Sequence, residues 1–269
     1  MSSNSPIRLE RDGGVAKLTL TRPEAANALN MEMGEALMRA AIELDEDESV
    51  RAVLLTGEGK MFCAGGDLGA MDQAGQANAE GGGTAAYLKE LTTYLHAAIS
   101  RFARMRAPVV TAVNGTAAGA GFSMVCATDL AIASETAKFT MAYTGAGLSP
   151  DGSSSYFLPR IIGQRRTFEL MLTNRVLNSA DALDWGLVNQ VVPAEELMST
   201  AEDLVQHLAA GPTNAYGIVK RLLVNSTYDS LESQMEHEAR GIAASSKTPD
   251  GQEGIAAFLA KRRPSFTGK

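Results

Sequence analysis

The sequence predicts an α/β fold in which parallel strands alternate with helices. Short runs rich in β-branched and aliphatic residues alternate with stretches whose apolar residues recur at the spacing of a helix face. Strands that alternate with helices pair in parallel, because the chain must cross over the sheet between them. The length of 269 residues allows one large domain, or a domain with an appendage, with a substantial core.

The first predicted unit is a strand at 14–22, a helix at 31–45 and a strand at 50–56. The same order then repeats through a polar, Gly-rich loop at 70–83, a helix at 84–105, a strand at 107–113, a turn at Asn114-Gly115, a helix from about 119, and strands at 129–133 and 138–143. Residues 73–83 are the low-complexity part of the loop, and their small polar residues predict a mobile segment.

The last third of the chain is predicted to be mainly helical. We expect a helix at 164–175, a short strand at 187–192 that ends at Pro193, and further helices at 194–210, 213–228 and 231–246, with a last one ending near 262. Helices without strands must bury their apolar stripes against the main domain or another subunit. The sequence therefore predicts a core at 1–195 and a helical region at 196–269.

Composition excludes several classes of function. Lys and Arg number 24 and Asp and Glu 31, which gives a net charge of −7 and disfavours nucleic acid as a partner. Cys63 and Cys126 lack metal-ligand spacing and are expected to be reduced thiols, so we expect neither disulfides nor a metal site. The polar start of the chain, residues 1–11, and the lack of a long apolar run predict a cytoplasmic protein without a membrane span.

Two Gly-rich turns lie where a predicted strand leads into a helix. The first is Cys63-Ala64-Gly65-Gly66-Asp67-Leu68 and the second runs from Asn114 to Gly121. Glycines at such junctions let backbone N–H groups approach a ligand, and two amides aimed at one oxygen would form an oxyanion hole. The same turns are also compatible with a role in packing alone. Neither contains a P-loop or a dinucleotide-binding fingerprint.

Several segments together resemble the enoyl-CoA hydratase/isomerase (crotonase) superfamily. They cover nearly the whole chain in order: TRPEAANALN (21–30), MFCAGGDL (61–68), APVVTAVNGTAAGAGFSMVCATDLAIAS (107–134), AYTGAGLSPDG (142–152), DWGLVNQVVP (184–193) and FLAKRRPSF (258–266). The resemblance implies a spiral of ββα units, a C-terminal helical region that makes a homotrimer or a dimer of trimers, and an acyl-CoA thioester as substrate. It implies no cofactor beyond the coenzyme A of that substrate.

The resemblance also assigns roles to residues of the two turns. By position in the motifs, the main-chain N–H groups of Gly66 and Ala120 would form the oxyanion hole. Substrate contacts are implied for Ala64, Asp67, Leu68, Gly119 and Lys261. Lys261 belongs to a basic run, 261–263, that is equally explained by favourable charge at a helix C-terminus.

The positions that carry two glutamates in hydratases of this family hold Ser123 and Tyr143. Neither is a carboxylate, and a phenol is a poor base at neutral pH, although Tyr143 stays a candidate for the site. Asp151 is the remaining acid, and its position is similar to that of the aspartate in single-acid isomerases of the family. A carboxylate in an apolar pocket suits proton transfer between two carbons. The Pro-Asp-Gly sequence is equally typical of a turn or a helix cap.

His96 supports a rival interpretation. It stands at the same distance before Asn114 as the general-base histidine of 4-chlorobenzoyl-CoA dehalogenases, in which the residue aligned with Asp151 is the nucleophile. A lone histidine on a helix is also typical of a surface position. Against a dehalogenase, Leu95 and Tyr143 replace the tryptophans of its aromatic pocket. We therefore expect an isomerase, with a dehalogenase or a non-catalytic acyl-CoA-binding relative as alternatives.

Overall fold

The computed structural model describes residues 5–80 and 82–269. Residues 1–4 of the predicted polar start and position 81 of the predicted loop lie outside the described residues. The largest sheet has the strand order β1-β2-β3-β5-β7-β10, and all neighbours pair in parallel except β1 with β2. Its strands are β1 (Ile7–Asp12), β2 (Val15–Leu20), β3 (Ala52–Gly57), β5 (Val109–Val113), β7 (Leu130–Ser134) and β10 (Gln190–Val192). This confirms the predicted α/β class and adds β1.

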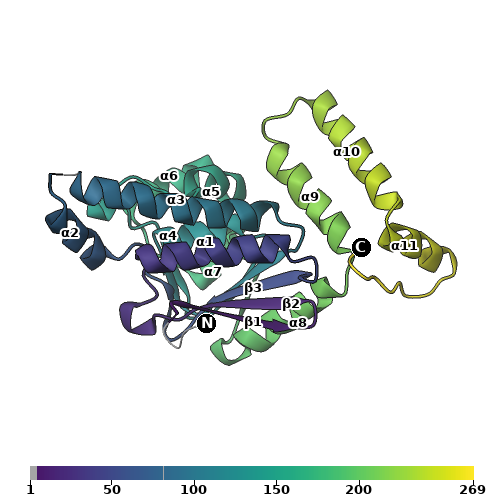
Figure 1. The fold of residues 1–269 in the computed structure, drawn as a ribbon, viewed down its shortest axis with the longest axis horizontal. Helices are drawn as coiled ribbons and strands as arrows, with labels where there is room; N and C mark the ends of the chain where they lie inside the picture. The colour runs from purple at the N-terminus through teal and green to yellow at the C-terminus, as the bar shows by residue number, and fades with distance from the viewer. Residues whose placement is uncertain (1–4, 81) are drawn as a thin grey trace.

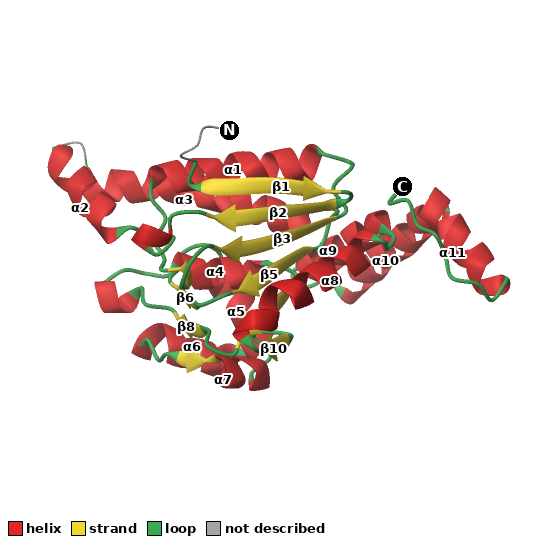
Figure 2. Cartoon of the chain, turned by 90° about the horizontal axis from the view of Figure 1, so that it is seen from below, coloured by secondary structure: helices red, strands yellow, loops and turns green. Residues whose placement is uncertain are grey.

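The two faces of this sheet bury different helices (Figure 2). Leu55 faces the core shared with α1 (Met31–Glu46) and its neighbours, whereas the adjacent Leu54 faces α8 (Leu197–Ala209). Alternate residues of a strand point to opposite faces, so β3 is apolar along its whole length. The helices on the first face also include α3 (Gly83–Arg104) and α4 (Ala120–Ala127).

A second, smaller sheet lies beside the first and has the order β4-β6-β8-β9. Its strands are β4 (Met61–Cys63), β6 (Thr116–Ala118), β8 (Lys138–Thr140) and β9 (Leu177–Asn178). Each of β4, β6 and β8 directly follows a strand of the large sheet and precedes a helix. The chain therefore repeats a ββα unit three times, and the two Gly-rich turns come after β4 and β6, at the same edge of the small sheet.

The loop predicted at 70–83 is wrong over most of its length. Residues Leu68–Ala77 form helix α2, which the Asp67 side chain caps by accepting a hydrogen bond from the N–H of Ala70 at 3.0 Å. Gly75 packs against Thr84 at the start of α3, so tertiary contact stabilises a segment with weak helical preference.

Shorter helices complete the part of the chain around the two sheets. These are α5 (Ser154–Ile162), α6 (Gln164–Thr173) and α7 (Ser179–Asp184), with 3₁₀ turns at Pro23–Ala25, Thr144–Ala146 and Ala194–Glu196. Helix α5 begins just after Asp151 and packs against α4. It thus ties the predicted acid to the helix that follows the second Gly-rich turn.

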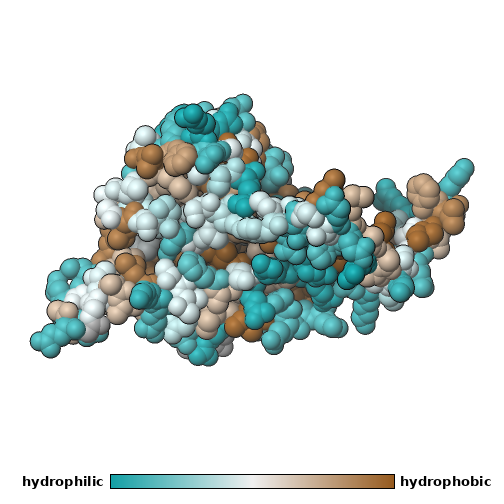
Figure 3. All heavy atoms as spheres, turned by 90° about the horizontal axis from the view of Figure 1, so that it is seen from above, coloured by the Kyte–Doolittle hydropathy of each residue, from teal (hydrophilic) through white to brown (hydrophobic). Residues whose placement is uncertain are grey.

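The chain ends in a helical arm that projects from the sheets (Figure 1). It consists of α9 (Thr213–Asn225), α10 (Leu231–Ser246) and α11 (Pro249–Leu259). Helix α8 lies beyond the predicted boundary at residue 195 but packs on the large sheet. Hydrophobic side chains are visible on the outer end of the arm (Figure 3). Among the described residues, no helix is both long and apolar enough to cross a membrane.

Candidate active site

The two Gly-rich turns touch each other through their glycines. Gly65 has φ of +94°, and a Cβ atom at this position would lie 3.0 Å from the carbonyl oxygen of Ala118 and 3.4 Å from the nitrogen of Ala120. A Cβ atom on Gly119 would lie 3.5 Å from the Cα atom of Gly65. Only glycine allows this approach and this backbone conformation together. The turns predicted from separate parts of the sequence therefore form one unit.

The backbone amides of this unit are oriented by their neighbours. The N–H of Leu29 donates to Gly65 at 2.7 Å, and the N–H of Asp67 donates to Leu29 at 2.9 Å. Successive amides of extended backbone alternate in direction, so the N–H of Gly66 points away from Leu29. Ala120 is the first residue of α4 and has no acceptor within its helix. Within residues 5–80 and 82–269, neither the Gly66 nor the Ala120 amide donates to a protein acceptor.

Asp151 lies in the segment between β8 and α5. Its backbone oxygen accepts hydrogen bonds from the Ser154 amide at 3.2 Å, from the Ser154 hydroxyl at 3.0 Å and from the Ser123 hydroxyl at 3.0 Å. The residue that precedes α5 is Ser153, and no side chain caps this helix. The Asp151 carboxylate is therefore not a helix cap, which rules out the cap interpretation of the Pro-Asp-Gly sequence.

The carboxylate of Asp151 instead meets the side chain of Tyr143. The phenol donates a hydrogen bond to Oδ1 of Asp151 at 2.5 Å, and Ser123 Oγ lies 3.0 Å from the same phenol oxygen. Burial, the negative charge of Asp151 and the hydrogen bond to it all raise the pKa of Tyr143 well above its ordinary value of 10. The phenol thus stays protonated and serves as a donor rather than a base.

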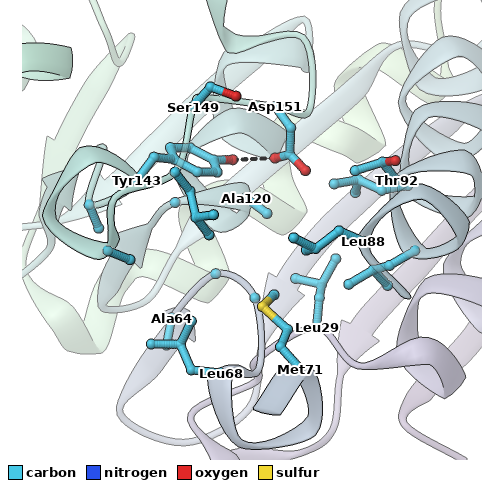
Figure 4. Close-up of a pocket in the computed structure, with 18 residues that line it drawn as sticks. Leu29, Ala64, Leu68, Met71, Leu88, Thr92, Ala120, Tyr143, Ser149 and Asp151 are labelled. Carbon is cyan, nitrogen blue, oxygen red and sulfur yellow. Dashed lines mark hydrogen bonds between the residues drawn. The ribbon is translucent and has the colours of Figure 1, made fainter. Parts of the chain in front are cut away.

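An apolar pocket of about 250 Å³ joins these groups (Figure 4). The Gly-rich turns form one wall and the Tyr143–Asp151 pair another, with leucines of α3 between them (Figure 4). The lining consists of Leu29, Ala64, Gly65, Gly66, Leu68, Met71, Leu88, Leu91, Thr92, Leu95, Gly119, Ala120, Ala142, Tyr143, Ala146, Leu148, Ser149 and Asp151. The two residues whose amides have no protein acceptor, Gly66 and Ala120, therefore line the same largely apolar pocket as Asp151.

Most of the predicted site residues gather in this pocket, but Asp67 does not. Ala64, Gly66, Leu68, Gly119, Ala120, Tyr143 and Asp151 all line it. The Asp67 carboxylate caps α2 and forms an ion pair with Arg22 at 3.2 Å, so it has protein partners in place of a substrate. Arg22 also donates to the carbonyl of Ala28 at 2.6 Å. This pair fixes the first Gly-rich turn against the segment before α1.

His96, which the sequence suggested as a candidate base, also lies outside the pocket. It is exposed on α3 and lines a separate hollow with Ser153 and Tyr156. Its Nε2 atom accepts a hydrogen bond from the N–H of Gly152 at 3.2 Å. The imidazole thus contacts the backbone of the loop that carries Asp151, and no contact joins it to the carboxylate.

Lys261 lies just after α11, on the projecting arm, and is exposed. The pocket of the same chain has no contribution from it. A role in binding coenzyme A would therefore require a second subunit, and it stays a prediction.

Leu88 and Leu91 of α3 are lining residues that the sequence analysis missed, whereas Leu95 was named there as the replacement of a pocket tryptophan. Leu88, Leu91 and Leu95 follow one another at intervals of three and four, which places them on one face of the helix. This spacing was a usable signal, but it does not distinguish a pocket wall from ordinary core. Leu29 and Met71 complete the apolar lining from segments far apart in the sequence.

In the described residues, no three His, Cys, Asp or Glu side chains are grouped so that they could hold a metal ion. Both cysteines are buried and unpaired.

Comparison with known proteins identifies the family of this chain. A model of the family described as enoyl-CoA hydratase/isomerase matches residues 10–269. The chain belongs to the enoyl-CoA hydratase/isomerase family. This confirms the resemblance drawn from the motifs, and with it membership of a family of acyl-CoA enzymes.

Relatives within the enoyl-CoA hydratase/isomerase family carry different reactions in their names. The chain is 38% identical over 258 residues to a 1,2-epoxyphenylacetyl-CoA isomerase of Escherichia coli, covering 95% of this chain and 96% of that protein. It is 37% identical over 267 residues to a 4-chlorobenzoyl coenzyme A dehalogenase of an Arthrobacter species, covering 98% and 95%. The solved structure of an enoyl-CoA hydratase from Polaromonas sp. JS666 matches with a TM-score of 0.89 at 34% identity, covering 97% of this chain and 99% of that one. The similarity confirms the fold, but it does not decide among the reactions that the names of these relatives give.

Proposed function

We propose that this protein is an isomerase that shifts a double bond of an acyl-CoA thioester through an enolate. The observation that carries the proposal is that Gly66 and Ala120, whose amides have no protein acceptor, line one apolar pocket together with Asp151. Two such donors stabilise negative charge on a thioester oxygen, and each contributes about 3–4 kcal/mol to the transition state. The carboxylate supplies the proton transfer.

The proposed reaction needs a single acid. With a 3-enoyl thioester bound, the C2–H bond breaks, its proton goes to Asp151, and its electron pair is delocalised over C2, C4 and the thioester oxygen. The same carboxyl group then returns the proton to C4, which leaves the double bond between C2 and C3. The apolar lining excludes water, which protects the enolate from protonation by solvent.

Hydration is the less suitable reaction for this site. Activation of water by two glutamates requires two carboxylates, and the corresponding positions hold Ser123 and Tyr143. The hydroxyl of Tyr143 donates to Asp151, and its raised pKa prevents it from acting as a base near neutral pH. The site thus favours an isomerase over a hydratase.

Dehalogenation is the second candidate, and the Arthrobacter relative favours it. In that reaction Asp151 would attack a haloaroyl-CoA ring and displace halide, and His96 would activate the water that releases the aryl group. The position of His96 outside the pocket and the aliphatic residue Leu95 within it count against this chemistry. Halide release from 4-chlorobenzoyl-CoA, lost on replacing either Asp151 or His96, would establish it.

We propose further that the C-terminal arm forms a homotrimer or a dimer of trimers. The three helices of the arm expose large hydrophobic side chains to water: Val219, Leu223, Leu231, Met235, Ile242, Ile255, Phe258 and Leu259. Association of copies would cover them, and it would allow Lys261 to approach the site of a neighbouring subunit. Light scattering on the purified protein gives the mass of the assembly, and a monomer would contradict the proposal.

The isomerase proposal is tested with the variant Asp151→Asn, which keeps the shape of the side chain and an acceptor for Tyr143. We expect kcat for conversion of 3-enoyl-CoA to 2-enoyl-CoA to fall by about 10²–10⁴-fold, as for loss of a general base. Asp203→Asn, an exposed site on α8, is the matched control and should leave kcat unchanged. Unchanged turnover in Asp151→Asn, measured by the absorbance of the conjugated thioester, would overturn the proposal.

A further inference from the structure

The two oxygens of the Asp151 carboxylate have different surroundings. Oδ1 accepts the hydrogen bond from Tyr143 at 2.5 Å. Within the described part of the chain, no donor contacts Oδ2, which points away from Tyr143 toward the side of the pocket formed by Thr92 and Leu88 (Figure 4). One oxygen is therefore occupied by the protein, and the other faces the space that an acyl group would fill.

Tyr143 is itself held in a fixed place. Its hydroxyl lies 3.0 Å from Oγ of the fully buried Ser123, which also lies 3.2 Å from the carbonyl of Gly119 and 3.0 Å from the backbone oxygen of Asp151. Ser123 thus joins the second Gly-rich turn to the Asp151 loop. The phenol has one hydrogen and donates it to Asp151, so its oxygen can only accept from Ser123. The hydroxyl of Ser123 therefore donates either to the phenol oxygen or to one of the two backbone carbonyls.

We propose that Tyr143 is a positioning residue: its hydrogen bond to Oδ1 of Asp151 makes Oδ2 the single proton-transfer atom and keeps that oxygen directed at the substrate. The consequence for catalysis rests on the proposed isomerase function. The consequence for the titration of the carboxylate does not.

The arrangement serves both protonation states of the acid. While the carboxylate is ionised, the phenol makes a charge-assisted hydrogen bond to Oδ1, which favours the charged form. After a proton moves from the substrate to Oδ2, Oδ1 becomes a carbonyl oxygen and still accepts from the phenol. No side chain has to turn between proton uptake and proton return, so the same oxygen can move the proton between C2 and C4.

Other titratable groups near the Asp151 loop lie on its far side. His96 and Arg104 approach it from α3, and Tyr156 approaches it from α5, all in the hollow beside Ser153. Among these, His96 contacts the loop through the N–H of Gly152. Replacing Tyr143 leaves all of them in place, so a change in the titration of Asp151 is attributable to the phenol.

The test compares Tyr143→Phe with wild type in two measurements. The first is ¹³C NMR of aspartate labelled at Cγ, in which the Asp151 signal is the one absent from Asp151→Asn. Loss of a hydrogen bond to a charged group should move the midpoint of this titration up by about one pH unit. The second is the pH profile of kcat/KM with 3-enoyl-CoA, whose acidic limb should move up by the same amount while KM stays nearly constant.

Two further variants complete the experiment. Tyr156→Phe removes a phenol whose hydroxyl donates to Val224 outside the pocket, so it should shift neither measurement. Ser123→Ala, which withdraws the support of Tyr143, should move the NMR midpoint in the same direction by a smaller amount, and it replaces Tyr143→Phe if that variant does not fold.

The outcomes separate the two proposals. A shifted NMR midpoint without isomerase turnover in the wild type would refute the proposed function and support the role of Tyr143. Turnover in the wild type with the same NMR midpoint and the same acidic limb in Tyr143→Phe would overturn the positioning role alone.

Discussion

The contact between the two Gly-rich turns makes Gly65→Ala a direct test of the oxyanion arrangement. The new Cβ atom would lie 3.0 Å from the Ala118 oxygen and 3.3 Å from the Cα atom of Gly119. Both are backbone atoms, so the contact is relieved only by moving one turn away from the other. The amide of Ala120 moves with the second turn, whereas the amide of Gly66 belongs to the first.

The magnitude follows from these distances. An alanine at φ of +94° costs about 1–3 kcal/mol in the free energy of unfolding, which corresponds to a melting temperature roughly 2–12 °C lower in a chain of this size. Displacing one oxyanion donor costs about 10²–10³-fold in kcat. We therefore expect kcat for 3-enoyl-CoA isomerisation to fall about 100-fold, with a protein that stays folded at assay temperature.

The matched control is Gly69→Ala, four residues further along. Gly69 is exposed near the start of α2, and its added Cβ atom would make an ordinary 3.5 Å contact with the Asp67 side chain. Alanine favours the helix, so neither kcat nor stability should fall. Wild-type kcat in Gly65→Ala, with crystallography showing the two turns moved apart, would refute the reasoning that both amides bind one oxygen.

Two further predictions concern stability. Lys220 is buried, with Nζ 2.7 Å from the Asp129 carboxylate, and burial raises the pKa of Asp129 while it lowers that of Lys220. Lys220→Met leaves this carboxylate without its partner and should lower the free energy of unfolding, measured in urea at pH 7, by about 3–5 kcal/mol. The double variant Lys220→Met/Asp129→Asn should recover most of that loss. Equal destabilisation of the single and the double variant would contradict this account. Partly buried Glu253 has its pKa lowered from 4.5 to about 2, mainly by its hydrogen bond with Arg262. A carboxyl group whose pKa is lowered in the folded state stabilises the fold at pH values above its ordinary pKa. Hydrogen-exchange protection at the end of α11 should therefore decline between pH 4.5 and 2 in the wild type and stay flat in Glu253→Gln. Identical profiles for the two proteins would refute this prediction.

The sequence predicts the long elements well, because their signals are local. The helix at Leu231–Ser246 has the predicted bounds, and the helix predicted at 31–45 is observed at Met31–Glu46. Strand β8 lies within the strand predicted at 138–143, but β4, β6 and β9 were missed, since they are two or three residues long and are specified by pairing between distant segments. Helix α2 was missed for a related reason: its composition is typical of a loop, and packing against α3 stabilises it.

The site was predicted in part for similar reasons. Gly66, Ala120 and Asp151 follow from motifs, and the structure brings them to one pocket. The bond from Tyr143 to Asp151 is absent from the pattern, because it depends on a backbone turn. Ala142 adopts φ of +57° and a 3₁₀ turn follows at Thr144–Ala146, which returns the chain toward the phenol. No periodicity in the sequence encodes that geometry.

Replacing two carboxylates by hydroxyls changes what the same pocket can do. A glutamate accepts hydrogen bonds from a water molecule and can take a proton from it. Ser123 and Tyr143 each have one hydrogen to donate instead, and Tyr143 donates its hydrogen to Asp151. Among the described residues that line the pocket, Asp151 is then the one carboxylate, with no second carboxylate to share the activation of a water molecule. The free amides of Gly66 and Ala120 are independent of this exchange, since they are main-chain groups fixed by the glycines. In the proposed isomerase, the half of the site that stabilises the enolate is thus separable from the half that transfers the proton, and Tyr143 belongs to the second.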